Sequence, residues 1–255
     1  MIESALCGLR IGSVPYLNAK PLLWGIEEGI DFAVPSTLSD AFNAGKLDVA
    51  LLPVFEALQV PGAQIVEGYA IGAIGPVTSV ILVSHEPVSE IQEIALDPAS
   101  RTSVSLLRIL LRGKFHTQPS LVLREAQAGD ARLIIGDPAL AFREGSTEGW
   151  HIMDLAEEWV RWTELPFVFA AWTLRPGLPQ AKDIAEALRA VARRGLAARS
   201  EIASSQPHPE ASLRYLEHAI HYSFGDREKA GLACYQEYLG AYGLIPADRT
   251  PVCFV

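Results

Sequence analysis

The sequence predicts an α/β protein of two lobes, and three observations support this fold class. Short apolar runs typical of buried strands alternate with helical patterns from the start of the chain. The connections between these elements are short, which favours parallel strands joined by right-handed crossovers. The alternation restarts after the strand-breaking segment 85–87, and from Pro179 onward the pattern is helical. Two strand-and-helix units followed by C-terminal helices therefore account for the chain.

The first unit is predicted to begin with three strands separated by helices. The strands are residues 9–14, 32–34 and 48–52. The last of these is almost continuously apolar, as expected of a parallel strand buried on both faces. The helices are 21–28, 35–45 and a short segment after Pro53 that carries Glu56. Proline opens the first two of these helices, because its missing N–H is not needed in the first helical turn.

The second unit and the return of the chain continue the pattern. Strands are predicted at 78–84, 93–96, 121–123, 132–135 and 165–173. Helices are predicted to end at Leu111 and Phe142, and the C-terminal helices are clearest at 181–198 and 228–241. We expect residues 1–84 and 167–255 to form lobe 1 and residues 85–166 to form lobe 2, with the active site in the cleft between them. Two chain crossings and a C-terminal helical cap are typical of the type II periplasmic-binding-protein-like fold.

Composition and charge narrow the class of protein. Of the 255 residues, 49% are hydrophobic and 20% are charged, as in an ordinary globular protein. The net charge of −9 argues against nucleic acid as a partner, because such proteins normally carry a basic face. No segment approaches the roughly 20 apolar residues of a membrane helix. Residues 1–8 carry no export signal and the cysteines form no CxxC pair, which predicts a cytoplasmic protein.

Several common motifs are absent from the sequence. It contains no GxGxxG, Walker or GxSxG sequence, so the usual signs of a bound nucleotide or an esterase nucleophile are missing. His218 and His221 could share one face of a predicted helix, but no further ligand accompanies them. We therefore expect an exposed helix surface there and no metal site.

The turn after the first strand is the first candidate for a ligand site. It presents Tyr16 and Asn18 just before Pro21. In open α/β sheets this turn lies in the crevice outside the strand ends, where small molecules bind. Asn18 could point at a ligand that Tyr16 also contacts. Alternatively, Asn18 could only cap the following helix while Tyr16 packs in the core.

A cluster of hydroxyl groups is the second candidate, at the start of a predicted helix. Ser100, Thr102 and Ser103 lie where the free backbone N–H groups of that helix would add to an anion site. A helix cap without a ligand is the commoner use of such a sequence. Three hydroxyls exceed what a cap needs, however, and this favours a bound carboxylate.

Asp137 and Ser79 are further candidates, because each lies where a strand meets a turn. Asp137 follows the strand 132–135 and precedes Pro138. It could cap the next helix, or it could reach into the cleft as a base or an orienting group. Ser79 begins a predicted crossing strand and could contact a ligand where the lobes meet, or it could only pack within the strand.

Six short motifs in series lie between residues 14 and 172. They are residues 14–22 (VPYLNAKPL), 45–53 (GKLDVALLP), 77–80 (VTSV), 100–107 (SRTSVSLL), 135–140 (IGDPAL) and 165–172 (LPFVFAAW). In this order they resemble the chorismate dehydratase family of the futalosine route to menaquinone. That family has the two-lobed binding-protein fold and removes water from chorismate to give 3-[(1-carboxyvinyl)oxy]benzoate. The resemblance therefore implies a lyase with a small dianionic substrate and with no metal or organic cofactor.

The resemblance also implies roles for the candidate residues. The active-site asparagine of the family falls on Asn18 and its active-site serine on Ser79, which would orient the substrate and hydrogen-bond the departing oxygen. The hydroxyl cluster within 100–103 matches the place where a substrate carboxylate would be held. The proton acceptor could be the substrate's own side-chain carboxylate, with Asp137 as the alternative from the protein.

Two other functions stay open. A later lyase of the same pathway, of the 1,4-dihydroxy-6-naphthoate synthase type, would share the fold and act on a larger cyclic futalosine derivative. The turn 15–18 resembles the dehydratase instead. A non-catalytic binding protein for small anions is the second alternative, although the missing export signal disfavours a transport receptor. No feature of the sequence specifies an oligomeric state.

Overall fold

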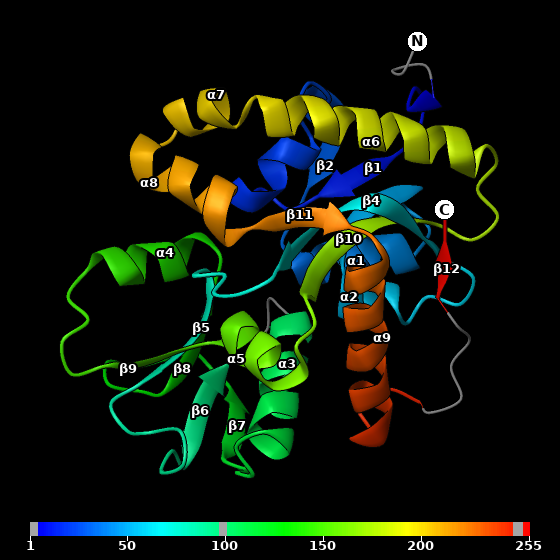
Figure 1. The fold of residues 1–255 in the computed structure, drawn as a ribbon. Coiled ribbons are helices and arrows are strands. Elements are labelled where there is room, and N and C mark those ends of the chain that lie inside the picture. The colour runs from blue at the N-terminus through cyan, green and yellow to red at the C-terminus, as the bar shows by residue number, and fades with distance from the viewer. Residues whose placement is uncertain (1–4, 97–100, 247–251) are drawn as a thin grey trace.

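Two β-sheets with helices packed around them make up the fold (Figure 1). The structure is a computed structural model that describes residues 5–96, 101–246 and 252–255. Within these residues the larger sheet has seven strands: β1 (Ile11–Ser13), β2 (Ile30–Phe32), β3 (Val49–Pro53), β4 (Gln64–Ala73), β10 (Phe167–Leu174), β11 (His221–Phe224) and β12 (Cys253–Phe254). Their order is β11-β4-β10-β3-β1-β2, and β12 pairs with β4.

The larger sheet combines parallel and antiparallel pairs. Strand β1 is parallel to β2 and β3, whereas β10 is antiparallel to β3 and β4. Every residue of β3 is buried, as its continuous apolar sequence requires. The turn that follows β1 is therefore anchored next to the fully buried strand β3.

The smaller sheet contains the strands between the two chain crossings. They are β5 (Val80–Ser84), β6 (Glu93–Leu96), β7 (Ser120–Leu123), β8 (Arg132–Ile135) and β9 (His151–Asp154), in the order β7-β6-β8-β5-β9. The sequence-based division assigned residues 80–84 to lobe 1, but β5 pairs with β8 and β9. A buried run of five apolar or small residues suits either sheet, so composition alone did not place this strand. We therefore propose a lobe boundary ahead of β5.

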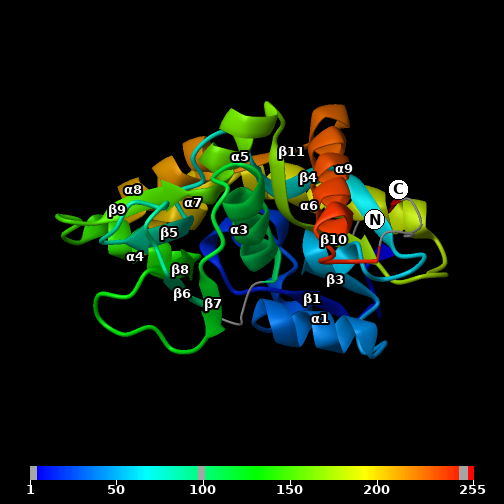
Figure 2. The same cartoon turned by 90° about the horizontal axis from the view of Figure 1, so that it is seen from below.

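Helices pack against both sheets, and α3 contacts α2, α5 and α9 (Figures 1 and 2). They are α1 (Pro35–Asn43), α2 (Val54–Ala57), α3 (Arg101–Gly113), α4 (Asp137–Glu144), α5 (Leu155–Thr163), α6 (Ala181–Ala197), α7 (Arg199–Ser204), α8 (Pro209–Arg214) and α9 (Asp226–Ala241). Helix α9 stands beside α3, and the core where α5, β10 and α9 meet is aromatic. There the ring of Trp159 packs edge-on against Phe167 and Tyr235, at centroid distances of 5.3 and 6.3 Å.

The described residues also form two 3₁₀ helices and one π-helix, and one of these corrects a prediction. They are the 3₁₀ helices η2 (Leu17–Leu22) and η3 (Glu27–Gly29) and the π-helix η4 (Tyr215–Ala219). The helix predicted from Pro21 is instead η2, which starts earlier and contains Pro21. Asn18 therefore lies inside this helix, and its side chain does not cap it.

The sequence missed several elements of the structure. Strands β4, β9 and β11 and helix α5 were not predicted. Strand β4 carries glycines and partly exposed polar residues that break the apolar pattern. His221 begins β11, although a helical surface was expected there, so it does not share a helix with His218. Its Nε2 lies 3.0 Å from Oε1 of Glu228.

Helix η2 is held in place by a close approach of α6. Gly195 of α6 faces the backbone of Pro21, and an added Cβ at Gly195 would lie 1.9 Å from the carbonyl oxygen of Pro21. Only glycine permits this distance, so the position of η2, and of Asn18 within it, depends on the missing side chain.

We expect Gly195→Ala to destabilise the protein by about 1–3 kcal/mol, because the new methyl group must push η2 and α6 apart. Alanine raises helix propensity by about 1 kcal/mol, so a net loss reports the close contact. Urea unfolding measures the difference. Gly29→Ala is the matched control, since nothing lies within 4 Å of its added Cβ. Equal stability of the two variants would contradict this account.

Candidate functional site

A cavity of about 80 Å³ lies between the two sheets. The larger sheet contributes apolar residues of β3, β4 and β10 to its wall, and the smaller sheet contributes Val80 and Ile135. Its polar lining comes from residues that the sequence analysis singled out: Tyr16, Asn18, Ser79, Thr102 and Ser103. These five candidates come from three segments of the chain and line one cavity.

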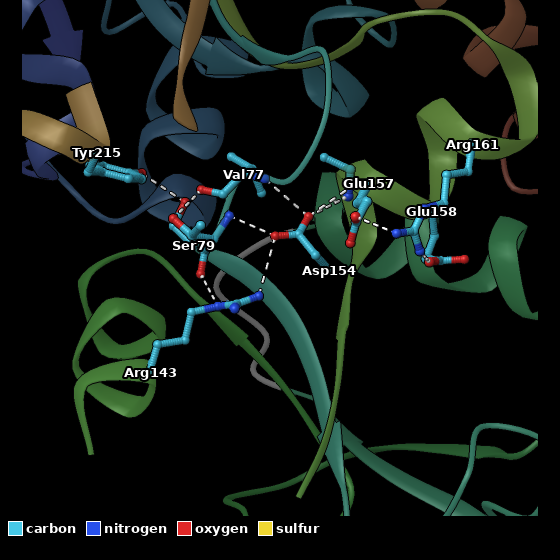
Figure 3. Close-up of polar contacts among 10 residues, drawn as sticks. Val77, Ser79, Arg143, Asp154, Glu157, Glu158, Arg161 and Tyr215 are labelled. Atoms are coloured by element: carbon cyan, nitrogen blue, oxygen red, sulfur yellow. Dashed lines mark hydrogen bonds and ion pairs between the residues drawn. The ribbon is translucent and has the colours of Figure 1, made fainter. Parts of the chain in front are cut away.

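Asn18 and Ser79 are connected through a residue that the sequence did not indicate, Tyr215. The Nδ2 of Asn18 donates to the Tyr215 hydroxyl at 3.2 Å. The Tyr215 hydroxyl in turn donates to Oγ of Ser79 at 2.8 Å (Figure 3). Burial raises the pKa of Tyr215 well above its ordinary value, so the phenol stays protonated and can donate.

This chain of contacts leaves two hydrogen-bonding groups for a ligand. The Oδ1 of Asn18 is buried and has no hydrogen-bond partner among the described residues. Because Oγ of Ser79 accepts from Tyr215, its own hydroxyl hydrogen can be donated elsewhere. An unpaired buried acceptor costs free energy, which a ligand's donor would recover. The cavity therefore offers one acceptor and one donor side by side.

The segment that carries Tyr215 also fixes the backbone of Asn18. The hydroxyl of Tyr222 donates to the carbonyl oxygen of Asn18 at 2.9 Å. Tyr215 itself begins the π-helix η4, and such helices occur frequently at functional sites. No sequence signal linked these tyrosines to Asn18, since 197 positions separate Tyr215 from it.

The hydroxyl cluster lies at the start of α3, as predicted. Thr102 and Ser103 are 1% and 3% exposed and line the cavity, while Ser100 lies outside the described residues. The Oγ1 of Thr102 accepts the backbone N–H of Phe55 at 3.1 Å. This bond ties the start of α3 to α2, which follows β3 of the larger sheet.

Glu56 forms an ion pair with Arg101 next to the hydroxyl cluster. Its Oε1 lies 2.9 Å from Nη1 of Arg101. Burial raises the pKa of Glu56 above its ordinary value, and the positive charge of Arg101 opposes that rise. Glu56 does not line the cavity, so it supports the junction of α2 and α3.

Tyr16 and Gly136 lie next to each other in the wall of the cavity. Gly136 has a φ of +68°, a left-handed conformation that glycine adopts without steric cost, and an added Cβ would lie 3.8 Å from the ring of Tyr16. Tyr16 is half-buried and belongs to the turn after β1. The ring therefore packs beside the start of α4.

Asp137 is not brought to the cavity. It is exposed, is the first residue of α4, and lines a separate hollow of about 750 Å³ between α4 and the segment formed by α8 and η4. The same hollow is bordered by Tyr215, whose hydroxyl points away to Ser79. Asp137 therefore lies in a neighbouring hollow, which Leu17, Thr78 and Tyr215 also line, and does not line the cavity that contains Asn18 and Ser79.

The described residues form neither a metal-binding cluster nor a membrane-spanning helix. Among the described residues, no group of three or more histidine, cysteine, aspartate or glutamate side chains could hold a metal ion. No helix in the same part of the chain is long and apolar enough to cross a membrane. The cavity between the sheets is the candidate site because it gathers Tyr16, Asn18, Ser79, Thr102 and Ser103.

The fold is a periplasmic-binding-protein-like fold. Protein AF1704 of Archaeoglobus fulgidus is 17% identical with a TM-score of 0.72, covering 93% of this chain and 98% of that one. The CA3427 gene product of Candida albicans, described as having the generic periplasmic binding protein fold, is 9% identical with a TM-score of 0.61, covering 93% and 90%. These likenesses show the fold.

Sequence comparison identifies the family. The model of the menaquinone biosynthesis family matches residues 9–241, and the chain belongs to that family. A chorismate dehydratase of Thermus thermophilus is 28% identical over 260 residues, which cover 90% of this chain and 94% of the relative.

We expect Tyr215→Phe to lower the free energy of unfolding by about 1–3 kcal/mol, because the buried amide of Asn18 loses its acceptor. Chemical denaturation measures this change. Tyr238→Phe is the control, since no hydrogen bond of the Tyr238 hydroxyl is found among the described residues. If both variants lost the same stability, the contact with Asn18 and Ser79 would not be the cause.

Proposed function

We propose that the protein is a chorismate dehydratase, which converts chorismate to 3-[(1-carboxyvinyl)oxy]benzoate and water. The observation that carries this proposal is the hydrogen-bonded chain from Asn18 through Tyr215 to Ser79 beside a small cavity. Membership of the menaquinone biosynthesis family and the likeness to the Thermus thermophilus enzyme support it.

The reaction removes a ring hydroxyl and the hydrogen on the adjacent, ether-bearing carbon. A base takes this proton, the electrons of the C–H bond form a new ring double bond, and the hydroxyl group leaves as hydroxide, which takes up the abstracted proton from the base to become water. The ring becomes aromatic, so the overall step is strongly downhill. The protein must therefore orient the substrate and stabilise the departing oxygen.

Ser79 is suited to the departing oxygen. Its Oγ accepts from Tyr215, so the hydroxyl hydrogen of Ser79 can be donated to the substrate. Hydrogen bonds in series polarise one another, which makes Ser79 a better donor than an isolated hydroxyl. Asn18, with its unpartnered Oδ1, would accept a hydrogen bond from the substrate and fix its orientation.

The substrate's own side-chain carboxylate is the proposed base. The described residues that line the cavity include no carboxylate, histidine or lysine. Asp137 lies outside the cavity, in the larger hollow. A substrate carboxylate held beside the ether-bearing carbon would take the proton without any ionised group of the protein.

Thr102 and Ser103, together with Ser100, are proposed to hold a substrate carboxylate. The positive end of the α3 dipole and the backbone N–H groups of its first turn favour an anion at this place. The turn 15–18, which resembles that of the dehydratase, favours chorismate over the larger cyclic futalosine derivative of the later pathway lyase.

Purified protein should convert chorismate to a product lighter by one water, measured by chromatography with mass detection. We expect Asn18→Ala and Ser79→Ala each to lower kcat by about 100-fold or more. Removal of one positioned hydrogen bond to a developing charge typically lowers kcat by about this factor. Binding of chorismate without turnover by the wild type would instead indicate a binding protein. Turnover of a cyclic futalosine derivative alone would indicate the later lyase.

Asp137→Asn distinguishes the two candidate bases. If the substrate supplies the base, kcat should stay within about threefold of the wild-type value, whereas loss of a protein base costs about 10²–10⁴-fold. Steady-state rates with chorismate measure the effect. A loss of about 100-fold without a change in stability would identify Asp137 as the base and contradict its exclusion from the site.

A further inference from the structure

We propose that Asp154 and Arg143 are positioning residues, which hold the backbone around Ser79 so that its hydroxyl meets Tyr215 and the departing oxygen of the substrate. This inference rests on the proposed function, in which Ser79 donates to that oxygen. Neither Asp154 nor Arg143 lines the cavity. Their effect on the reaction must therefore pass through the backbone.

The carboxylate of Asp154 joins two segments of backbone (Figure 3). It is 3% exposed, and it accepts the N–H of Val77 on Oδ1 at 3.2 Å and the N–H of Thr78 on Oδ2 at 2.7 Å. Its Oδ1 also accepts the N–H groups of Ala156 and Glu157, at 3.1 and 3.2 Å, and so caps α5. One carboxylate thus ties the crossing between β4 and β5 to the start of α5.

Arg143 reaches the same crossing from α4. Its Nε donates to the carbonyl oxygen of Thr78 at 3.1 Å, and its Nη2 lies 3.6 Å from Oδ2 of Asp154. The backbone N–H of Gly136, immediately before α4, donates to the carbonyl oxygen of Ser79 at 2.7 Å. The carbonyl groups at and before Ser79 are therefore held by α4, while Asp154 holds the preceding N–H groups.

Thr78 shows why such restraint is needed. Its φ is +63°, in the left-handed region that a β-branched residue adopts only when its surroundings enforce it. The Thr78 hydroxyl donates to the carbonyl oxygen of Val77 at 2.7 Å. Without Asp154 and Arg143 this residue could relax, and the rotation would turn Ser79, its direct neighbour, away from Tyr215.

A double-mutant cycle tests the proposal. Arg143→Met keeps the bulk of the side chain and removes its donors, and we expect kcat for chorismate to fall about 10- to 100-fold with little change in KM. In a Ser79→Ala background the same substitution should cost less than about threefold, because its effect is lost with the hydroxyl it positions. Arg161→Met, which removes two ion pairs on the surface of α5, is the matched control and should leave kcat unchanged.

Equal losses of kcat from Arg143→Met in both backgrounds would overturn the proposal, because Arg143 would then act independently of Ser79. Hydrogen exchange gives a second readout that does not depend on the reaction. Asp154→Asn and Arg143→Met should each accelerate exchange of the amides of residues 77–78 about tenfold or more. If chorismate is not turned over, the proposed function fails, while faster exchange still supports the restraint of this segment. Unchanged exchange in both variants overturns it.

Discussion

The hydroxyl group of Tyr215 makes the contacts on which the candidate site depends. It joins Asn18, which follows a strand of the larger sheet, to Ser79, which precedes a strand of the smaller one. A neutral phenol can donate one hydrogen bond and accept others, and burial keeps this one protonated. The other features of the site, from the close approach of α6 to η2 to the carboxylate of Asp154, hold the partners of this hydroxyl in place.

The polar lining of the cavity is uncharged, and this fits the proposed substrate. Chorismate brings two carboxylates, which hydroxyls and backbone N–H groups at the start of α3 can hold despite the net charge of −9 on the chain. Thr102 and Ser103 are buried, and hydrogen bonds of buried groups are stronger than hydrogen bonds in water. Positioning by neutral groups is then sufficient, provided that the substrate supplies its own base.

Sequence reasoning predicted the two-lobed α/β fold because the buried strands are continuous apolar runs with short connections. It also selected Asn18, Ser79, Thr102 and Ser103, which the structure brings to one cavity. It did not find Tyr215, since the hydrogen bond spans 197 positions and a tyrosine among helical residues carries no local signal. The expected division put residues 80–84 in lobe 1, whereas β5 pairs with β8 and β9 of the smaller sheet. An apolar strand sequence does not specify which strands it pairs with. Asp137 was selected because it follows a strand and precedes a proline. This local pattern does not indicate whether the side chain lines the cavity.

The most direct test of the central claim is a crystal structure of the Ser79→Ala variant with chorismate bound. The account predicts that chorismate occupies the cavity between the sheets, with its ring hydroxyl facing the position of the missing Oγ and near Asn18. Chorismate bound instead in the hollow beside Asp137, with the cavity between the sheets free of ligand, would contradict it.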